Sequence, residues 1–557
     1  SVIAEAQTEE DLKNLKGPIR LYISILHFAL RFPGFILLST VLLLIGVQIL
    51  YGILGRGVEF FPDIEPKAAS VLIHARGNLS VYEQDKLVRE VENRILDVEG
   101  VKVFYTESGE QDAQGSEDIA ADVIGKITIE LKDWDKRPSA TEILQEIRDR
   151  TQNIAGIHVE TQKQEEGPPS GKDIQIQIGS RFPETLEPAV EKVLSVLESD
   201  PDAIDIEDSR PLPGIEWELQ VDRAQASKFG IDISIIGDYV RMVTNGLKVT
   251  DYRPDGAEDE VDIVIRHSRE ERTLDQLDQV RIETNQGSIP ISNFVKRIPK
   301  PAVGTINRVD QHRVFTVKAN LKEGININEK VVGLKQYMED HKSEFDPRVT
   351  ISFTGEDEDQ REAQAFLQKA FVIALFTMAV ILVTQFNSFY SALLILFAVV
   401  MSTIGVMMGL LFTHQPFGIV MSGIGVIALA GIVVNNNIVL IDTYDTHIRR
   451  GLKVRDAIML TGVQRLRPVL LTTVTTVLGL MPMVLQLNID FIGRTVSQGA
   501  PSTQWWVQLS TAIVFGLTFS TILTLVVTPS ALMFREKAGR FKNWLISKIK
   551  PSKSQEI

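Results

Sequence analysis

Three consecutive asparagines, Asn435, Asn436 and Asn437, interrupt a long apolar run. Their amide side chains can donate and accept hydrogen bonds, which sets them apart from the apolar residues around them. Unpaired amides in hydrocarbon are costly, so these side chains should face the interior of a helix bundle. Downstream, Arg465 offers a permanent charge, and Thr472, seven residues and two helical turns later, offers a hydroxyl. Asn437 points about 100° away from Asn436 on a helix, so it is left out of this set.

A side chain that carries protons across a membrane must titrate there. The apolar runs contain no Asp or Glu, and their only Lys, Lys369, lies at an edge where it can reach the interface. Asp442 lies at the end of the asparagine-bearing run. The apolar runs therefore contain no side chain that could carry protons. The same Asn and Thr side chains could instead only hold helices together.

Six predicted transmembrane helices hold these residues. Crossing the hydrocarbon takes about 20 apolar helical residues. The stretches without Asp, Glu, Lys or Arg are 32–55, 370–441, 468–489 and 495–534. The second stretch is too long for one helix and breaks at 385–388 and 413–416. The predicted spans are 33–54, 366–385, 391–412, 418–441, 467–487 and 507–531.

Charge and composition limit the class of protein. Basic residues precede the first span, separate the fourth from the fifth and follow the sixth, which predicts that both termini are cytoplasmic and that 56–365 is outside. The net charge of -14 argues against a nucleic-acid binder held by phosphate contacts. None of the 557 residues is Cys, which excludes disulfides and thiolate chemistry. No nucleophile–base set or ligand cluster emerges, so we expect no enzyme, metal site or cofactor.

The external segment has the pattern of two α/β units. The first follows the order β-α-β-β-α-β of the ferredoxin-like plan. The second begins at 173, stops after 207 and resumes at 313, which makes 211–307 an insertion with its own strands and a helix near 232–244. Residues 167–171 (GPPSG) form the expected hinge between the units. The predicted elements of the first unit are strands at 69–76, 101–107, 126–131 and 157–161 and helices at 80–96 and 141–154.

Local motifs resemble the C-terminal half of the resistance-nodulation-division (RND) efflux permeases, over residues 18 to 540. Phe60-Phe61-Pro62-Asp63 resembles the start of the family's external domain, and Leu131-Lys132-Asp133-Trp134 resembles part of a porter subdomain. Residues 431–442 resemble the tenth helix, and residues 465–472 resemble the opening of the eleventh. The resemblance implies an α+β membrane protein with one transmembrane helix, ferredoxin-like porter subdomains with a docking insertion, and five further transmembrane helices.

The resemblance also implies an assembly and a location. The N-terminal half of the same permease would precede Ser1, and the family forms homotrimers in the bacterial inner (cytoplasmic) membrane. A periplasmic adaptor and an outer-membrane channel would complete a tripartite complex that exports amphiphilic small molecules in exchange for protons. The implied domains are a cytoplasmic linker (1–30), a transmembrane helix (31–55), two porter subdomains (56–170; 171–215 with 306–362), a docking insertion (216–305), five transmembrane helices (363–535) and a cytoplasmic tail (536–557).

In the family, paired aspartates on the fourth helix carry the protons, and this chain would form the opposite wall of their site. Asn435 and Asn436 would bond the carboxylates, Arg465 would offer charge, and Thr472 would offer a hydroxyl. The family often has Lys where Asn435 stands. With Asn, the ionised carboxylates have less support, so they should hold their protons to higher pH.

On the substrate side, drug-exporting relatives line a porter pocket with phenylalanines. Here Lys102, Phe104, Tyr105 and Thr128 take the corresponding strands and form the expected substrate cleft. The acidic loop 107–122 fits a cleft for cationic amphiphiles, or only a solvated loop. Scattered histidines and two external methionines argue against metal export. Two other functions stay open: a non-transporting scaffold that binds another permease, and an RND-like exporter of lipids or proteins.

Overall fold

The computed structural model describes residues 18–75, 77, 79–109, 120, 122–164, 171–210, 215–256, 259–284, 287–301, 306–322 and 324–549. It divides into two compact units. One holds the chain up to 75, residues 80–209 and the chain from 307 onward, and the other holds 76–79 and 210–306. The predicted hinge at 167–171 lies outside the described residues, apart from Gly171.

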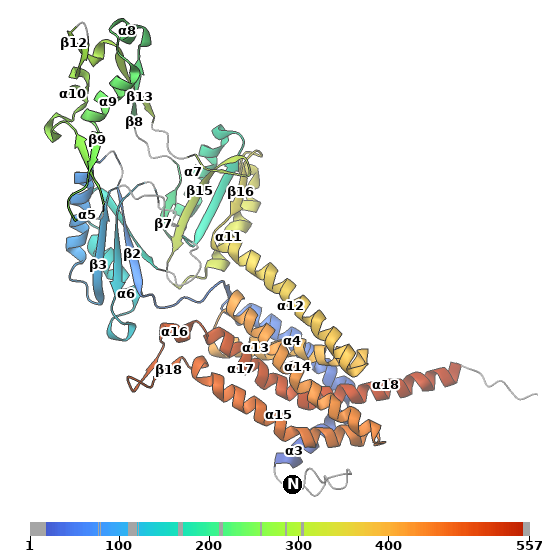
Figure 1. Ribbon diagram of the computed structural model, residues 1–557. Helices are drawn as coiled ribbons and strands as arrows, with labels where there is room; N and C mark the ends of the chain where they lie inside the picture. Colours follow the sequence, from blue (N-terminus) through green and yellow to red (C-terminus); the bar gives the residue numbers. More distant parts are fainter. Residues whose placement is uncertain are drawn as a thin grey trace, which may run out of the picture. The chain divides into compact units, whose positions relative to one another are not determined.

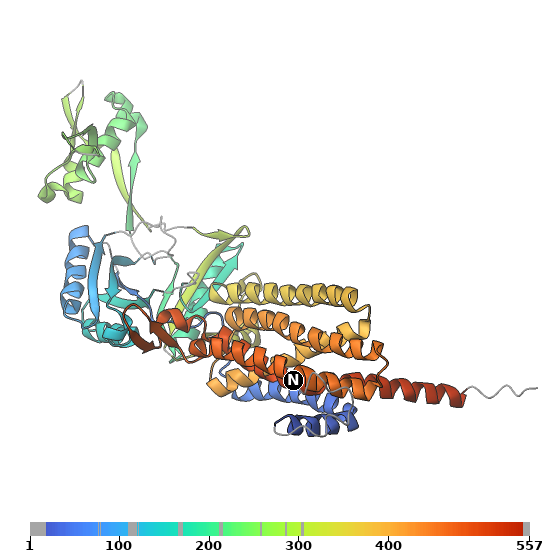
Figure 2. The same ribbon diagram turned by 60° about the horizontal axis from the view of Figure 1, so that its bottom comes forward.

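Within the described residues, six helical segments are long and apolar enough to cross a membrane, and they run side by side in the first unit (Figures 1 and 2). The predicted breaks after the second and third segments are confirmed, with Asn387 and His414 in the left-handed region. Helix α15 begins thirteen residues before the predicted span because its first part carries charged residues, among them Arg455, Asp456 and Arg465, which lie outside the charge-free stretch. The segments are α4 (Pro33–Leu54), α12 (Glu356–Phe386), α13 (Phe389–Thr413), α14 (Ile419–Arg449), α15 (Val454–Val484) and a continuous run of α17 (Val507–Ile522), the π-helical η6 (Leu523–Val527) and α18 (Thr528–Ile549).

Helices α13, α14 and α17 form the centre of the bundle. In the apolar windows of α17–α18, α13 and α14, 72%, 61% and 50% of the residues are buried, against 11% or less in α4, α12 and α15. Gly405 and Gly409, one turn apart on α13, let α17 approach closely. A β-carbon at Gly405 would lie 2.6 Å from the carbonyl oxygen of Phe515, a backbone atom that cannot swing away.

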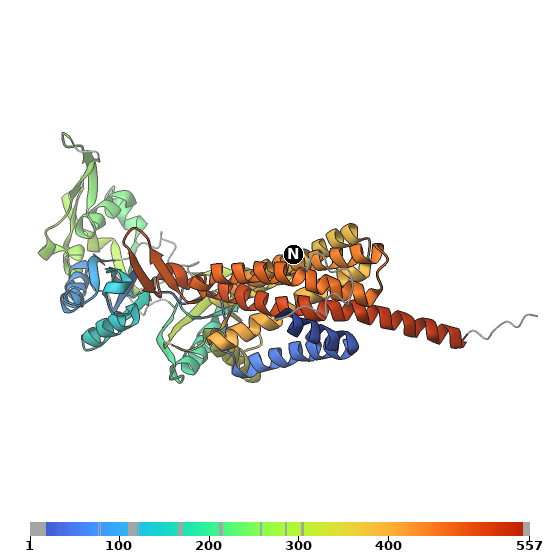
Figure 3. The same cartoon turned by 90° about the horizontal axis from the view of Figure 1, so that it is seen from below.

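Helix α3 (Pro18–Arg31) occupies much of the range predicted to be a linker. It packs Tyr22, Leu26 and Leu30 into the core of the bundle, and the Tyr22 hydroxyl donates a hydrogen bond to the Leu525 carbonyl at 3.0 Å. Lys537 of α18 donates to the carbonyls at the end of α3. Figure 3 shows α3 beside the bundle helices. The amphipathic pattern of residues 18–31 could have predicted this helix from the sequence.

The segment predicted to be external contains two α/β subdomains, which we call the external subdomains after that prediction. The first has a four-stranded sheet with strand order β3-β4-β2-β5. Ser80 and Glu83 form the predicted capping box at the start of its first helix. The elements, in chain order β-α-β-β-α-β, are β2 (Ala68–Ala75), α5 (Val81–Ile95), β3 (Val101–Ser108), β4 (Val123–Leu131), α6 (Ala140–Thr151) and β5 (Ile157–Lys163).

The second external subdomain repeats that chain order, and β15 is central to its five-stranded sheet. One end of β15 pairs with β14 (Arg308–Val309) and the other with β7, and β6 lies between β15 and β16. It has a hydrophobic core of its own, under α7 and α11 (Figure 1). The elements are β6 (Ile174–Ser180), α7 (Leu186–Glu198), β7 (Ala203–Asp208), β15 (His312–Leu321), α11 (Ile327–Asp340) and β16 (Thr350–Phe353).

The second unit of the chain interrupts this subdomain between β7 and β14 and also has its own core. Its ends are joined by the antiparallel strands β8 (Ile215–Val221) and β13 (Val295–Pro301). The predicted helix near 232–244 is present as α9 (Ile233–Val243), and the described residues hold two further short helices that the prediction lacked. The remaining elements are α8 (Arg223–Lys228), β9 (Leu247–Tyr252), β10 (Val261–Ile265), α10 (Leu274–Gln279), β11 (Arg281–Thr284) and β12 (Gly287–Pro290).

Two short strand pairs lie at the ends of the bundle helices. Strand β1 (Val58–Glu59), just after α4, pairs in parallel with β17 (Phe417–Gly418), just before α14. Between α15 and α17, a hairpin of β18 (Leu487–Asp490) and β19 (Thr495–Gln498) leads to the short helix α16 (Pro501–Gln504). This hairpin was not predicted.

The glycine contact between α13 and α17 predicts that Gly405→Ala destabilises the purified chain by about 1–3 kcal/mol, because the added methyl group overpacks the contact. Thermal unfolding in detergent measures this. The matched control is Gly431→Ala on α14, where an added β-carbon meets no atom within 4 Å in the described structure. Equal midpoints for both variants would show that the close approach does not limit packing.

Candidate functional site

Helix α14 turns its three asparagines in three directions, as 100° per residue requires. Asn437 is fully buried, Asn436 is 7% exposed and Asn435 lies on the open surface. Within the described residues, the side chains of Asn435 and Asn436 make no hydrogen bond. Asn437, which the prediction left out, therefore has the amide with the most hydrogen bonds. The amides of the predicted residues Asn435 and Asn436 still have free donors and acceptors.

Asn437 bonds α14 to the π-helical part of the last span. Its Nδ2 donates to Thr524 Oγ1 at 3.1 Å and to the Val433 carbonyl at 3.0 Å, and its Oδ1 accepts from Thr528 Oγ1 at 2.8 Å. Both threonines are buried. Asn437 thus binds one helix to another. The sequence had suggested this role, as an alternative to proton relay, for its neighbours Asn435 and Asn436. Threonines four residues apart on a predicted span were the available signal.

The other two predicted relay residues lie on α15. Arg465 Nε donates to Thr443 Oγ1 of α14 at 2.7 Å, so the guanidinium is held against that helix. Thr472 is exposed and bonds only to the Val469 carbonyl of its own helix, whereas the adjacent Thr473 is buried and bonds Thr521 of α17 at 2.6 Å. The structure thus brings Arg465 to α14 and leaves Thr472 open.

The open side of α14 is a stripe that runs from Ile424 to Asn435 and resumes at Asp442, beyond the half-buried Ile438 and Val439. Its exposed residues recur at helical spacing, which places them on one face. The adjoining part of α15 is also open, with Leu471 60% exposed. Asn435 and Thr472 are therefore polar groups on an uncovered apolar surface of this chain. The residues of the stripe are Ile424, Ala428, Gly431, Asn435 and Asp442.

The four residues predicted to line the substrate cleft do not all share one face of the sheet. Tyr105 pairs with Thr128 across β3 and β4, so the two share the open face of the sheet. Phe104 pairs with Ile129 and faces the opposite, helix-covered side, because neighbouring strand residues alternate in direction. Lys102 forms an exposed ion pair with Glu130 at 2.6 Å.

The acidic loop of the cleft prediction falls mostly at 110–119 and 121, outside the described residues. Its last member, Asp122, is described and accepts a hydrogen bond from His74 Nδ1 at 2.9 Å. Asp122 is thus paired with a histidine, and its side chain is 26% exposed. His74 and His158, counted among scattered histidines in the sequence, stand opposite each other on β2 and β5, with ring centroids 5.9 Å apart.

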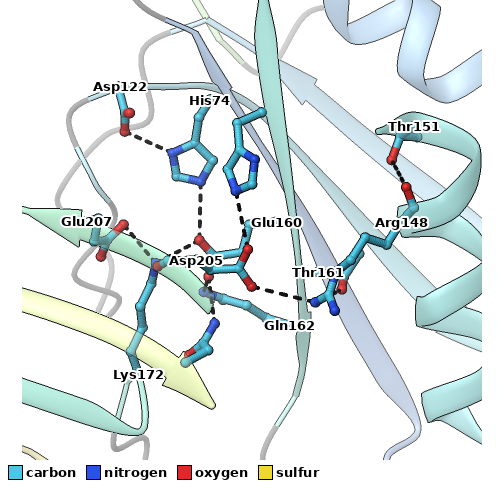
Figure 4. A network of polar contacts seen from close by, with 12 residues as sticks. His74, Asp122, Arg148, Thr151, Glu160, Thr161, Gln162, Lys172, Asp205 and Glu207 are labelled. Atoms are coloured by element: carbon cyan, nitrogen blue, oxygen red, sulfur yellow. Dashed lines mark hydrogen bonds and ion pairs between the residues drawn. The ribbon is translucent and has the colours of Figure 1, made fainter. Parts of the chain in front are cut away.

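These groups belong to a buried charge network between the two external subdomains (Figure 4). His74 Nε2 lies 3.4 Å from Glu160 Oε2, an ion-pair distance without hydrogen-bond geometry. Lys172 Nζ lies 2.8 Å from Glu160 and 3.1 Å from Glu207. Three or more metal-ligating side chains do not gather anywhere in the described part of the chain.

The network shifts the pKa values of its members. Burial alone would lower the pKa of His74, but Asp122 and Glu160 outweigh burial and raise it to about 9. Burial alone would raise the pKa of Glu160, but His74 and Lys172 lower it to about 2. Burial dominates at Glu207 and raises its pKa. His74, Glu160 and Lys172 are therefore charged together at neutral pH.

A bundle of apolar helices and two external α/β subdomains, one of them interrupted by an insertion, define a membrane permease of the RND class. The family model described as AcrB/AcrD/AcrF matches residues 11–535, and the chain belongs to this family. The resemblance seen in the sequence is thus confirmed. RND efflux permeases are inner-membrane transporters rather than enzymes.

Relatives and solved structures agree with this assignment. Multidrug resistance protein MdtC of Erwinia tasmaniensis is 26% identical over 365 residues, which cover 64% of this chain and 33% of MdtC. Swarming motility protein SwrC of Bacillus subtilis is 23% identical over 512 residues, which cover 91% of this chain and 46% of SwrC. The crystal structure of a heavy metal efflux pump shares the fold, with a TM-score of 0.73 at 20% identity, over 93% of this chain and 51% of that chain. The chain spans a third to a half of the length of these relatives.

The contacts of Asn437 predict that Asn437→Ala destabilises the bundle by about 1–2 kcal/mol, the upper range for a hydrogen-bonded side chain between membrane helices. Thermal unfolding in detergent measures the loss. Asn435→Ala is the matched control on the same helix and should leave the midpoint unchanged, since Asn435 makes no side-chain bond in the described residues. Equal losses for both variants would contradict the contact.

The raised pKa of His74 predicts a pH-dependent stability difference between the wild type and His74→Gln. A raised pKa stabilises the folded state fully below the ordinary value of about 6.5, and the effect is lost as pH rises through about 9. The wild type should therefore unfold at a higher temperature than His74→Gln at pH 6, and the difference should vanish above pH 9. A difference that grows with pH would contradict the charged state of His74.

Proposed function

We propose that this chain is the C-terminal half of a proton-driven RND exporter and provides one wall of its proton relay. The observation that carries the proposal is the position of Asn435 on the open stripe of α14. Thr472 of α15 is also exposed. An unpaired amide facing lipid is costly, so a protein surface with polar groups is the fitting cover for this stripe.

The charges support the same interpretation. The apolar runs hold no Asp or Glu, so the proton carrier has to come from the part of the permease that covers the stripe. Arg465, held by Thr443, supplies a fixed positive charge near the inner end of that surface. Asn435 and Asn436 have unused donors that can bond carboxylates in their ionised state. We infer that those carboxylates are aspartates of an N-terminal half.

We further propose the arrangement that the family resemblance implies. The spans are arranged 1+5 in the bacterial inner membrane, and two ferredoxin-like porter subdomains and a docking insertion extend into the periplasm. The permease works as a homotrimer with a periplasmic adaptor and an outer-membrane channel. Its substrates are amphiphilic small molecules. Tyr105 and Thr128, which share one face of the sheet, are the proposed contacts in the substrate cleft.

The test is transport by the complete permease in proteoliposomes, with ethidium, a lipophilic cation, as the probe. A hydrogen bond to a charged group contributes about 1.5–3 kcal/mol, so Asn435→Ala should slow proton-driven ethidium efflux by roughly ten-fold or more. Asn435→Lys supports the ionised carboxylates and should move the pH dependence of efflux toward lower pH.

Ile424→Val, eleven residues earlier on the same stripe, is the control and should transport like the wild type. If neither change at Asn435 alters efflux or its pH dependence while ethidium is transported, the relay role is wrong. If the complete wild-type protein moves neither ethidium nor protons, the scaffold function takes the place of the exporter.

A further inference from the structure

The two external subdomains have separate sheets and separate cores. The contacts between them are therefore distinct from the contacts that hold each subdomain together. Within the described residues, no strand of one sheet pairs with a strand of the other. The core of the second subdomain contains no residue of the first. Ion pairs and hydrogen bonds of the buried charge network join them in the described part of the chain (Figure 4).

The first half of the network is an acid of the first subdomain held by the second. Glu160 of β5 is 1% exposed. Its carboxylate receives Lys172 Nζ at 2.8 Å and Asn320 Nδ2 at 3.2 Å, both from the second subdomain. Lys172 is also buried, with 5% of its side chain exposed.

The second half runs in the opposite direction. Asp205 of β7, in the second subdomain, has 5% of its side chain exposed. It forms an ion pair with Arg148, whose side chain is 34% exposed, at 3.6 Å from a guanidinium nitrogen. It also lies 3.2 Å from Nε2 of the exposed His158, and both basic residues belong to the first subdomain. Each subdomain thus gives one buried acid to the basic groups of the other.

The backbone of Asp205 ties the two halves together. Asp205 adopts a φ of 51°, in the left-handed region that residues other than glycine rarely adopt. In this conformation its carbonyl accepts a hydrogen bond from Lys172 at 2.6 Å while its carboxylate faces Arg148 and His158. Strained residues persist where the surrounding contacts over-determine them, and they cluster at switch regions.

We propose that these crossed ion pairs form an ionic latch that sets the separation of the two external subdomains and opens as a unit. A buried ion pair stabilises a contact only weakly, because the attraction between the charges is largely offset by the free energy lost when both charges leave water. Losing one member leaves an uncompensated buried charge, so the partners separate and rehydrate together. Such a contact is specific in geometry yet reversible, which suits two subdomains that part and rejoin, whereas an apolar interface would hold them permanently.

The test measures the separation directly, in the complete permease, and does not depend on transport. Because this chain contains no Cys, spin labels can be placed on exposed positions by Asn153→Cys in the first subdomain and Ser195→Cys in the second. Pulsed electron resonance then gives the distribution of distances between the labels. For the wild type we expect one dominant distance.

Lys172→Met should raise the population at longer distance roughly ten-fold or more, and Lys172→Arg, which keeps the charge, should retain the wild-type distribution. Glu160→Gln, which keeps the shape and loses the charge, should open the latch as Lys172→Met does and serves if that variant fails to fold. The control is Lys102→Met, which breaks the exposed Lys102–Glu130 pair within the first subdomain. A folded Lys172→Met or Glu160→Gln with the distribution of the wild type would overturn the latch, as would equal opening in Lys102→Met.

Discussion

The amide of Asn437, bonded to Thr524 and Thr528 around the π-helical segment, fixes how α14 is turned in the bundle. Hydrocarbon offers no water to satisfy a stray amide, so an asparagine in a span must find its partners in another helix. Thr524 can reach it because α17, the helix that leads into this segment, packs closely against α13 at Gly405 and Gly409. Tyr22 of α3 also bonds this segment, at the Leu525 carbonyl.

The orientation of the remaining asparagines follows from that one contact. With Asn437 turned inward, Asn435 lies about 200° around the helix and must face outward. The open stripe, and with it the proposed relay wall, is thus a geometric consequence of the Asn437 bond rather than a separate feature. The external subdomains follow a different rule. Outside the membrane, water can hydrate a charge that loses its partner. The buried charge network between the two external subdomains is therefore a contact that can be broken.

Much of the architecture could be predicted from the sequence because its signals are local. Missing charges mark the spans, left-handed Asn387 and His414 end two helices near the predicted breaks, and the Ser80–Glu83 box starts a helix where expected. Long-range pairing has no such signal. Antiparallel register brings His74 opposite His158, and the spacing within either strand could not show this. The opposite directions of Phe104 and Tyr105, by contrast, follow from alternation within one strand and could have been predicted. The periodicity of α14 separated Asn437 from Asn436 correctly, but it could not show which of the two faces the neighbouring helices.

The most direct measurement is an experimental structure of the complete native permease at a resolution that shows side chains around Asn435. The account predicts that protein covers the open stripe of α14 and that a carboxylate oxygen lies within hydrogen-bond distance of the amide of Asn435 or Asn436. Lipid acyl chains packed against Asn435, with no carboxylate near either amide, would contradict it.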